Sequence, residues 1–118
     1  MVRHIMKLKD PWYSFISKGE KKIEGRINDD KRKKIFIGDE IMFVNENDPN
    51  VFILKKISKK KEFINFESAL YRLSIDQELN FLLPGIKNLR EGLNIYYNIP
   101  SYKEESEKNG VVLLYLSD

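Results

Sequence analysis

Three charged side chains lie close together in the chain, at Lys21, Glu24 and Arg26. Residues 21–27 alternate with a period of two, which predicts a strand with Glu24 and Arg26 on the same face. In that arrangement Arg26 and Lys21 bind a phosphate or a base edge, while Glu24 accepts hydrogen bonds from an exocyclic amine or holds Arg26 in position. The alternative is a partly buried Glu24–Arg26 ion pair that stabilises the strand, with Lys21 in solvent. Strongly coupled charges in clefts are enriched at functional sites, which favours a binding site.

Aromatic side chains near this segment are further candidates for ligand contact. Trp12 offers a flat face to an unpaired base, a contact worth about 1 to 3 kcal/mol. Its place in a short apolar helical pattern also fits a core position, which is the commoner role for a single Trp. Tyr96, Tyr97 and Tyr102 are candidates for stacking or for hydroxyl donation, and Tyr102 is the better one because it stands outside the helical stripe that contains the other two. Tyr97 is expected to pack between helix and barrel.

The composition excludes several kinds of chemistry. The chain has 118 residues, no Cys and one His, His4, which excludes Cys-based zinc sites, thiol catalysis and a cluster of histidine ligands. The P-loop, the G-x-G-x-x-G fingerprint, H-E-x-x-H and G-x-S-x-G are all absent. We therefore expect no metal and no cofactor, and a structural role for His4.

The length and the apolar segments predict one domain away from membranes. A chain of this size forms a single compact core without disulfides. No apolar stretch approaches the roughly 18 to 20 residues that span a bilayer, and charges at Arg3, Lys7 and Lys9 are unlike a signal peptide. We expect a cytoplasmic protein with a single domain over residues 1–118 and no membrane partner.

Charge is unevenly distributed along the chain. Residues 1–61 hold 16 Lys or Arg and 9 Asp or Glu, whereas residues 62–118 hold 5 and 9. A basic half is typical of nucleic-acid binders, because phosphate contacts release counterions. The alternative is that the lysines keep exposed strand edges soluble. The lysine-rich run at 55–61 extends a binding groove in the first interpretation and is simply solvated in the second.

The periodicity predicts a mixture of strands and helices that positions these residues. Asp10 caps a helix that ends at Gly19, and the turn Gly38-Asp39 begins a strand. The expected strands are 2–8, 21–27, 40–44, 51–57 and 111–116. The expected helices are 11–18, 67–73, a short one near 79–83, 89–97 capped by Asn88, and 101–108 capped by Ser101. Residues 28–34 are expected to form a loop, and 58–62 a turn or strand edge.

The last strand is apolar on both faces and should lie centrally in the sheet. Strands gather early and helices late, which favours an α+β fold or a small barrel with helices packed around it.

The segment after the first helix resembles the ASCH domain family, a branch of the PUA-like superfamily. Its hallmark G-x-K-x-x-E-x-R is met by Gly19, Lys21, Glu24 and Arg26, and its G-D turn by Gly38-Asp39. The resemblance covers essentially the whole chain. It implies a PUA-like mixed β-barrel and a basic cleft, formed by the hallmark segment, that binds RNA or a modified nucleotide.

The resemblance also implies enzymatic alternatives, since members of the family include ribonucleases and hydrolases of acylated cytidine. The amidohydrolase members use a motif Lys, a Thr three residues later and a downstream Glu. Lys21 matches the first, Glu24 stands in the place of the Thr, and the third position stays open between Glu67 and Glu78. Lys21 and Glu24 would then act as an acid and base pair without a metal.

A third alternative is a protein-interaction adaptor. The segment 103–107 is rich in Glu and predicted to be helical. In this role it would dock on a basic partner protein.

Overall fold

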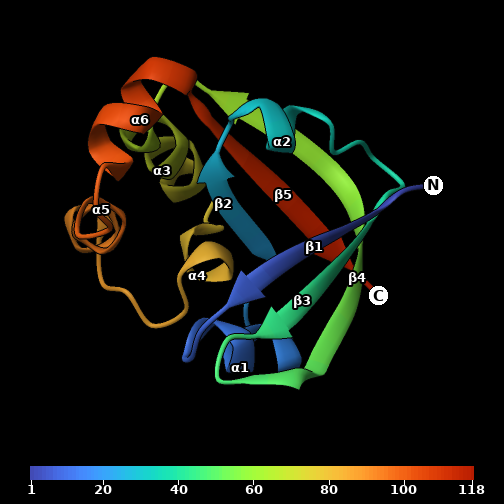
Figure 1. The fold of residues 1–118 in the computed structure, drawn as a ribbon. Coiled ribbons are helices and arrows are strands. Elements are labelled where there is room, and N and C mark those ends of the chain that lie inside the picture. The colour runs from blue at the N-terminus through green and yellow to red at the C-terminus, as the bar shows by residue number, and fades with distance from the viewer.

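The computed structural model describes all residues 1–118, which form one curled sheet with the helices of residues 66–109 gathered on one side (Figure 1). The sheet has five strands in the order β1-β3-β4-β5-β2. β1 and β3 run parallel, and every other pair is antiparallel. The strands are β1 Arg3–Leu8, β2 Ile23–Ile27, β3 Glu40–Asn45, β4 Asp48–Phe63 and β5 Val111–Ser117. The helices are α1 Trp12–Ser17, α2 Asp30–Lys33, α3 Phe66–Ile75, α4 Leu79–Leu82, α5 Leu89–Tyr97 and α6 Tyr102–Asn109.

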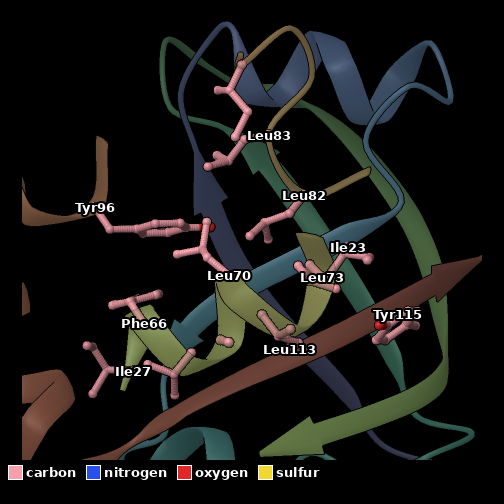
Figure 2. Close-up of a cluster of buried hydrophobic side chains, with 13 residues drawn as sticks. Ile23, Ile27, Phe66, Leu70, Leu73, Leu82, Leu83, Tyr96, Leu113 and Tyr115 are labelled. Atoms are coloured by element: carbon pink, nitrogen blue, oxygen red, sulfur yellow. The ribbon is translucent and has the colours of Figure 1, made fainter. Parts of the chain in front are cut away.

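Two hydrophobic clusters cover the two faces of β5. Val112 and Leu114 face the inside of the curl, where α1 contributes to the packing. Val111, Leu113 and Tyr115 face outward into a second cluster formed with α3, α4 and α5 (Figure 2). Because β5 is apolar on both faces and pairs with β4 and β2, the predicted central position is confirmed. The predicted α+β barrel is confirmed as a curled, five-stranded half-barrel.

The half-barrel is open along one seam, because β1 and β2 are the two edge strands. One side chain bridges the gap: Arg26 Nη2, on β2, donates to the carbonyl of Lys7, on β1, at 3.2 Å. The curl therefore brings the basic start of the chain next to the charged face of β2.

The ends of α1 follow from local sequence. Asp10 Oδ1 accepts hydrogen bonds from the amide and hydroxyl of Ser14 at 3.0 and 2.6 Å. The helix begins one residue later than predicted, with Pro11 rather than Asp10 in the cap position. Gly19, at φ +79°, ends the turn as expected, since this backbone conformation favours glycine.

The expected loop at 28–34, the expected Ser101 cap and the turn alternative for 58–62 were wrong. Residues 58–62 belong to β4, which continues because β5 pairs with it up to Phe63, and an irregular register between Ile57 and Lys59 accommodates Ser58. The loop 28–34 contains the short helix α2. Asp29 caps the start of this helix, because its Oδ1 accepts a hydrogen bond from the Arg32 amide at 3.0 Å. Ser101 makes no side-chain cap and has φ +68°, whereas the Asn88 cap of α5 is present.

Candidate functional site

A cavity of about 330 Å³ opens at the seam between β1 and β2. Its walls come from both edge strands, from Trp12 on α1, from Tyr96 on α5 and from Tyr102 on α6. Lys21, Glu24 and Arg26 also line it. These elements come from two parts of the sequence, residues 3–27 and 89–109, and the fold brings their side chains together.

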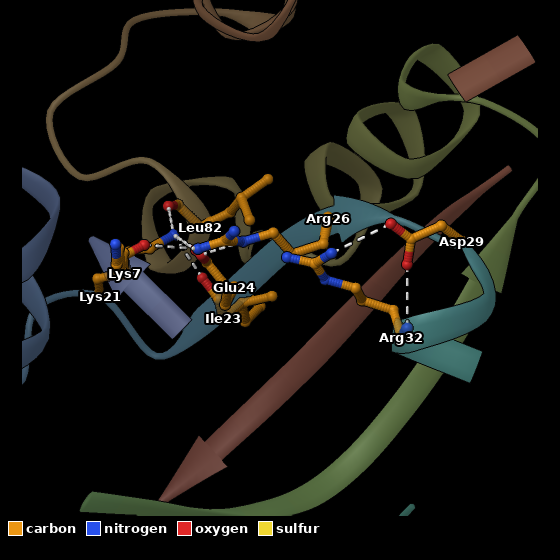
Figure 3. A network of polar contacts seen from close by, with 8 residues as sticks. All are labelled: Lys7, Lys21, Ile23, Glu24, Arg26, Asp29, Arg32 and Leu82. Carbon is orange, nitrogen blue, oxygen red and sulfur yellow. Dashed lines mark hydrogen bonds and ion pairs between the residues drawn. The ribbon is translucent and has the colours of Figure 1, made fainter. Parts of the chain in front are cut away.

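Lys21 is a buried ammonium with a full set of acceptors (Figure 3). Its Nζ donates to the carbonyls of Ile23 and Leu82, both at 2.6 Å, and lies 3.2 Å from Glu24 Oε1. An ammonium has three N–H donors, so no donor remains for a ligand. The alternative of a solvated Lys21 is thus wrong. Burial lowers the pKa of Lys21, and the neighbouring Glu24 offsets only part of that effect.

Glu24 and Arg26 share one face of β2, as the alternation predicted. Arg26 Nε donates to Glu24 Oε2 at 2.8 Å, and the Glu24 residue is 5% exposed. Burial alone would raise the pKa of Glu24, but the charges and hydrogen bonds of Arg26 and Lys21 together lower it. Burial likewise opposes the charge of Arg26, while Glu24 raises the Arg26 pKa. The carboxylate is therefore held ionised between two cations.

Trp12 and Tyr102 each have one side in the protein and one side at the cavity. Trp12 packs against both hydrophobic clusters, and Lys21 Nζ lies 5.9 Å from its ring centre. The Tyr102 ring is stacked on Phe66, with centroids 5.9 Å apart and planes 11° apart. For these two residues the core and cavity interpretations are compatible, because a half-buried ring serves both.

Tyr96, which the sequence offered as a candidate alongside Tyr102, also lines the cavity. Figure 2 shows its ring reaching from α5 toward the sheet, and it stacks on Phe66 at 4.2 Å between centroids. A Cβ on Gly25 would lie 2.9 Å from the Tyr96 hydroxyl, so this approach requires glycine in the middle of β2. A glycine inside a strand pattern is a signal of such close approach. The Tyr96 residue is 6% exposed, and its hydroxyl makes no hydrogen bond within the protein.

The mouth of the cavity carries further charges, at Lys7, Lys9 and Glu46. None of them stood out in the sequence, since only the curl of the sheet brings β1 next to β2. Together with the buried Lys21, Glu24 and Arg26 they leave an excess of positive charge around the cavity.

Other predicted basic residues do not join this site. The lysines of β4 are used elsewhere: Lys60 Nζ donates to Ile35 O at 2.8 Å, Lys61 lies 4.0 Å from Asp76, and Lys55 pairs with Asp118. They point to different faces of the strand and line no common groove with the cavity.

His4 has a structural partner. Its Nε2 lies 2.9 Å from Asp39 Oδ2. No group of three or more His, Cys, Asp or Glu side chains is placed to hold a metal ion. None of the helices has the length and apolar content that crossing a membrane requires.

The curled mixed sheet, its open seam and the cavity between the edge strands define a half-barrel domain of the PUA-like class. The family model of the ASCH domain matches residues 6–118. The chain belongs to the ASCH domain family, which is generally thought to bind RNA.

Solved structures share the fold over nearly the whole chain. The crystal structure of hypothetical protein PH0355 has a TM-score of 0.83 and 29% identity, over 98% of each chain. The solution structure of PF0455 from Pyrococcus furiosus has a TM-score of 0.70 and 26% identity, over 98% of this chain and 96% of that one. ASCH from Zymomonas mobilis, at 12% identity and a TM-score of 0.61 over 98% of this chain and 67% of that one, shares the fold alone. No curated protein matches the sequence.

Proposed function

We propose that this protein binds single-stranded RNA, or a modified nucleotide, with one nucleotide held in the cavity at the β1–β2 seam. The cavity volume of about 330 Å³ lies at the small end of the range for ligand pockets, about 300 to 1,000 Å³, and suits a single nucleotide. Lys7 and Lys9 at the mouth are suitably placed for the adjoining phosphates. Membership of a family generally thought to bind RNA supports the same class of ligand.

The single observation that carries the proposal is a pair of unused polar groups in one cavity. Arg26 donates through Nε and Nη2 to protein acceptors, which leaves Nη1 without a partner. The Tyr96 hydroxyl, in the same cavity, makes no hydrogen bond within the protein, and burial raises its pKa, so it stays a neutral donor. Both groups adjoin the cavity, so a ligand that supplies acceptors to both gains two hydrogen bonds there.

In this proposal each of the five residues predicted from the sequence has a distinct role. Arg26 contacts the ligand directly, and Glu24 orients Arg26 while keeping lone pairs for an exocyclic amine. Lys21 holds Glu24 and touches no ligand, because its donors are occupied. Trp12 and Tyr102 flank the base as walls.

Binding of a fluorescent single-stranded RNA, followed by anisotropy, tests the proposal. Raising salt from about 50 to about 200 mM should weaken binding tenfold or more if several lysines contact phosphates. Arg26→Ala should abolish most of the remaining affinity, whereas the matched control Arg90→Ala, at an exposed position on α5, should leave it unchanged. Undetectable or salt-insensitive binding, or equal loss in both variants, contradicts the proposal.

Hydrolysis of an acylated cytidine or of RNA is the second candidate. Burial lowers the pKa of the Lys21 ammonium, which is the direction of shift that a lysine base requires. The three acceptors around Lys21 Nζ and the lowered pKa of Glu24 weigh against it. Turnover of acylated cytidines or generic RNA that disappears in Lys21→Ala would support the enzyme, and absence of turnover would remove it.

A further inference from the structure

The outer face of β1, β3 and β4 carries large apolar side chains that no helix covers. Strand pairing aligns them in two neighbouring rows. One row joins Ile5, Met42 and Leu54, and the next joins Val44 and Phe52. Ile5, Phe52 and Leu54 are 56%, 51% and 39% exposed. We call these five residues the outer apolar face.

The outer apolar face differs from the rest of the sheet, where helices cover the outward side chains. The outward side chains of β5 and β2 lie beneath α3, α4 and α5, and Figure 1 shows α3 to α6 gathered on one side with β1, β3 and β4 forming the opposite side. Single exposed apolar residues are ordinary, but a contiguous patch marks an interaction site.

Charges border the outer apolar face asymmetrically. In the row beside it, Arg3 Nε pairs with Glu40 Oε1 at 2.7 Å, so Glu40 is already compensated. Lys56 ends that row, Lys7 lies at the opposite corner of the face, and both are exposed and unpaired. The border is therefore net positive and complements an acidic partner.

The dimensions fit one helix. Three adjacent strands place their outer members about 10 Å apart and a six-residue strand is about 20 Å long, which matches a helix about 10 Å wide and about 14 residues long. Two copies of this chain packed face to face would bring Lys7 and Lys56 of one copy against the lysines of the other, which disfavours a dimer. RNA is disfavoured as well, because bases stack on aromatic rings and Phe52 is the one aromatic residue of the five.

We propose that the outer apolar face docks an acidic amphipathic helix of a partner protein. The apolar stripe of the helix covers Ile5, Met42 and Leu54 with Val44 and Phe52, and its flanking carboxylates reach Lys56 and Lys7. Lys7 lies at the border between this surface and the cavity, but none of the five apolar residues lines the cavity, so the inference stands whether or not the cavity binds RNA.

Two designed peptides of about 14 residues, labelled with fluorescein, test it. Both carry Leu at helical spacing; one has Glu on both flanks and the other has Lys. The acidic peptide should bind with amide shifts in the NMR spectrum confined to the outer apolar face. Phe52→Ser should weaken it tenfold or more, and the control Tyr71→Ser, at an exposed position on α3 that is 60% exposed, should not. Lys56→Glu should weaken the acidic peptide and strengthen the basic one.

RNA binding should be the same in Phe52→Ser and in the unmodified protein, which separates this proposal from the proposed function. No binding of the acidic peptide up to about 1 mM, equal binding of both peptides, or insensitivity to Phe52→Ser overturns it. Sedimentation that shows a dimer lost in Phe52→Ser also overturns it, because the occupant is then a second copy.

Discussion

Two buried carboxylates, Glu24 and Asp39, are satisfied in different ways. Glu24 accepts from two side-chain cations, Lys21 and Arg26. Asp39 accepts from the backbone amides of Val2 and Phe36, at 3.2 and 3.0 Å, and lies 2.9 Å from His4. Backbone amides fix a turn, whereas side-chain cations present their remaining donors to whatever lies next to them. We therefore infer that Asp39 stabilises the turn before β3, whereas Glu24 forms part of the cavity wall.

The surroundings of the two carboxylates differ in the same way. A cavity adjoins Glu24, with an unpaired donor on Arg26 and another on Tyr96, while Asp39 lines no such cavity. Burial of a charged network does not by itself indicate a binding site. Here the indication comes from the hydrogen-bond donors without a protein partner that lie next to the network.

The largest effect should come from Lys21→Ala. It removes one of the two cations from a buried carboxylate and leaves the carbonyls of Ile23 and Leu82 unpaired. Breaking a buried ion pair in this way costs about 3 to 5 kcal/mol, measured as the free energy of unfolding in urea. Arg3→Ala is the control, because the Arg3 side chain is 51% exposed and exposed pairs contribute about 1 kcal/mol or less. Equal losses in the two variants would mean that Lys21 is solvated after all.

A smaller effect should follow Gly25→Ala. The new Cβ would lie 2.9 Å from the Tyr96 hydroxyl and 3.3 Å from Leu82 Cδ1, and such overpacking costs about 1 to 3 kcal/mol. Tyr96→Phe removes the closest atom without breaking a hydrogen bond, so it should have little effect on stability alone and should offset part of the Gly25→Ala loss. A double-mutant cycle in urea measures this coupling. Additive losses would place the Tyr96 hydroxyl away from Gly25.

Sequence patterns predicted the structure correctly where it depends on a single short segment. The alternation of residues 21–27 correctly placed Glu24 and Arg26 on one face, the Asn88 cap opened α5, and the apolar 111–116 lay centrally in the sheet. Each of these depends on spacing within a few residues.

Contacts between segments that are distant in the sequence could not be predicted from the sequence patterns. The continuation of β4 through Lys59 depends on β5, which lies far along the chain. The Lys7 carbonyl meets Arg26, and Tyr96 meets Gly25, only after the sheet has curled. No carboxylate lies near His4 in the sequence, but parallel pairing of β1 with β3 brings Asp39 next to it. The roles of the cavity residues in ligand binding remain predictions.

The smallest of the three effects on stability should be that of Asp39→Asn, and it should depend on pH. Its contact with His4 and the amides of Phe36 and Val2 lower the pKa of Asp39 to about 2, below its ordinary value of 3.8. Because the folded protein holds this carboxyl ionised more strongly than the unfolded chain does, its contribution is complete above about pH 4 and is lost as the pH falls toward 2.

Asn keeps one acceptor oxygen but carries no charge, so the variant should lose about 1 kcal/mol at neutral pH and show a flatter decline between pH 4 and pH 2. Urea midpoints across that range provide the measurement, with RNA affinity at pH 7 as the second readout. Unchanged affinity fits a carboxylate that only fixes the Gly38-Asp39 turn. A loss of RNA affinity as large as that of Arg26→Ala would mean that Asp39, like Glu24, contributes to ligand binding. The distinction drawn between the two carboxylates would then be wrong.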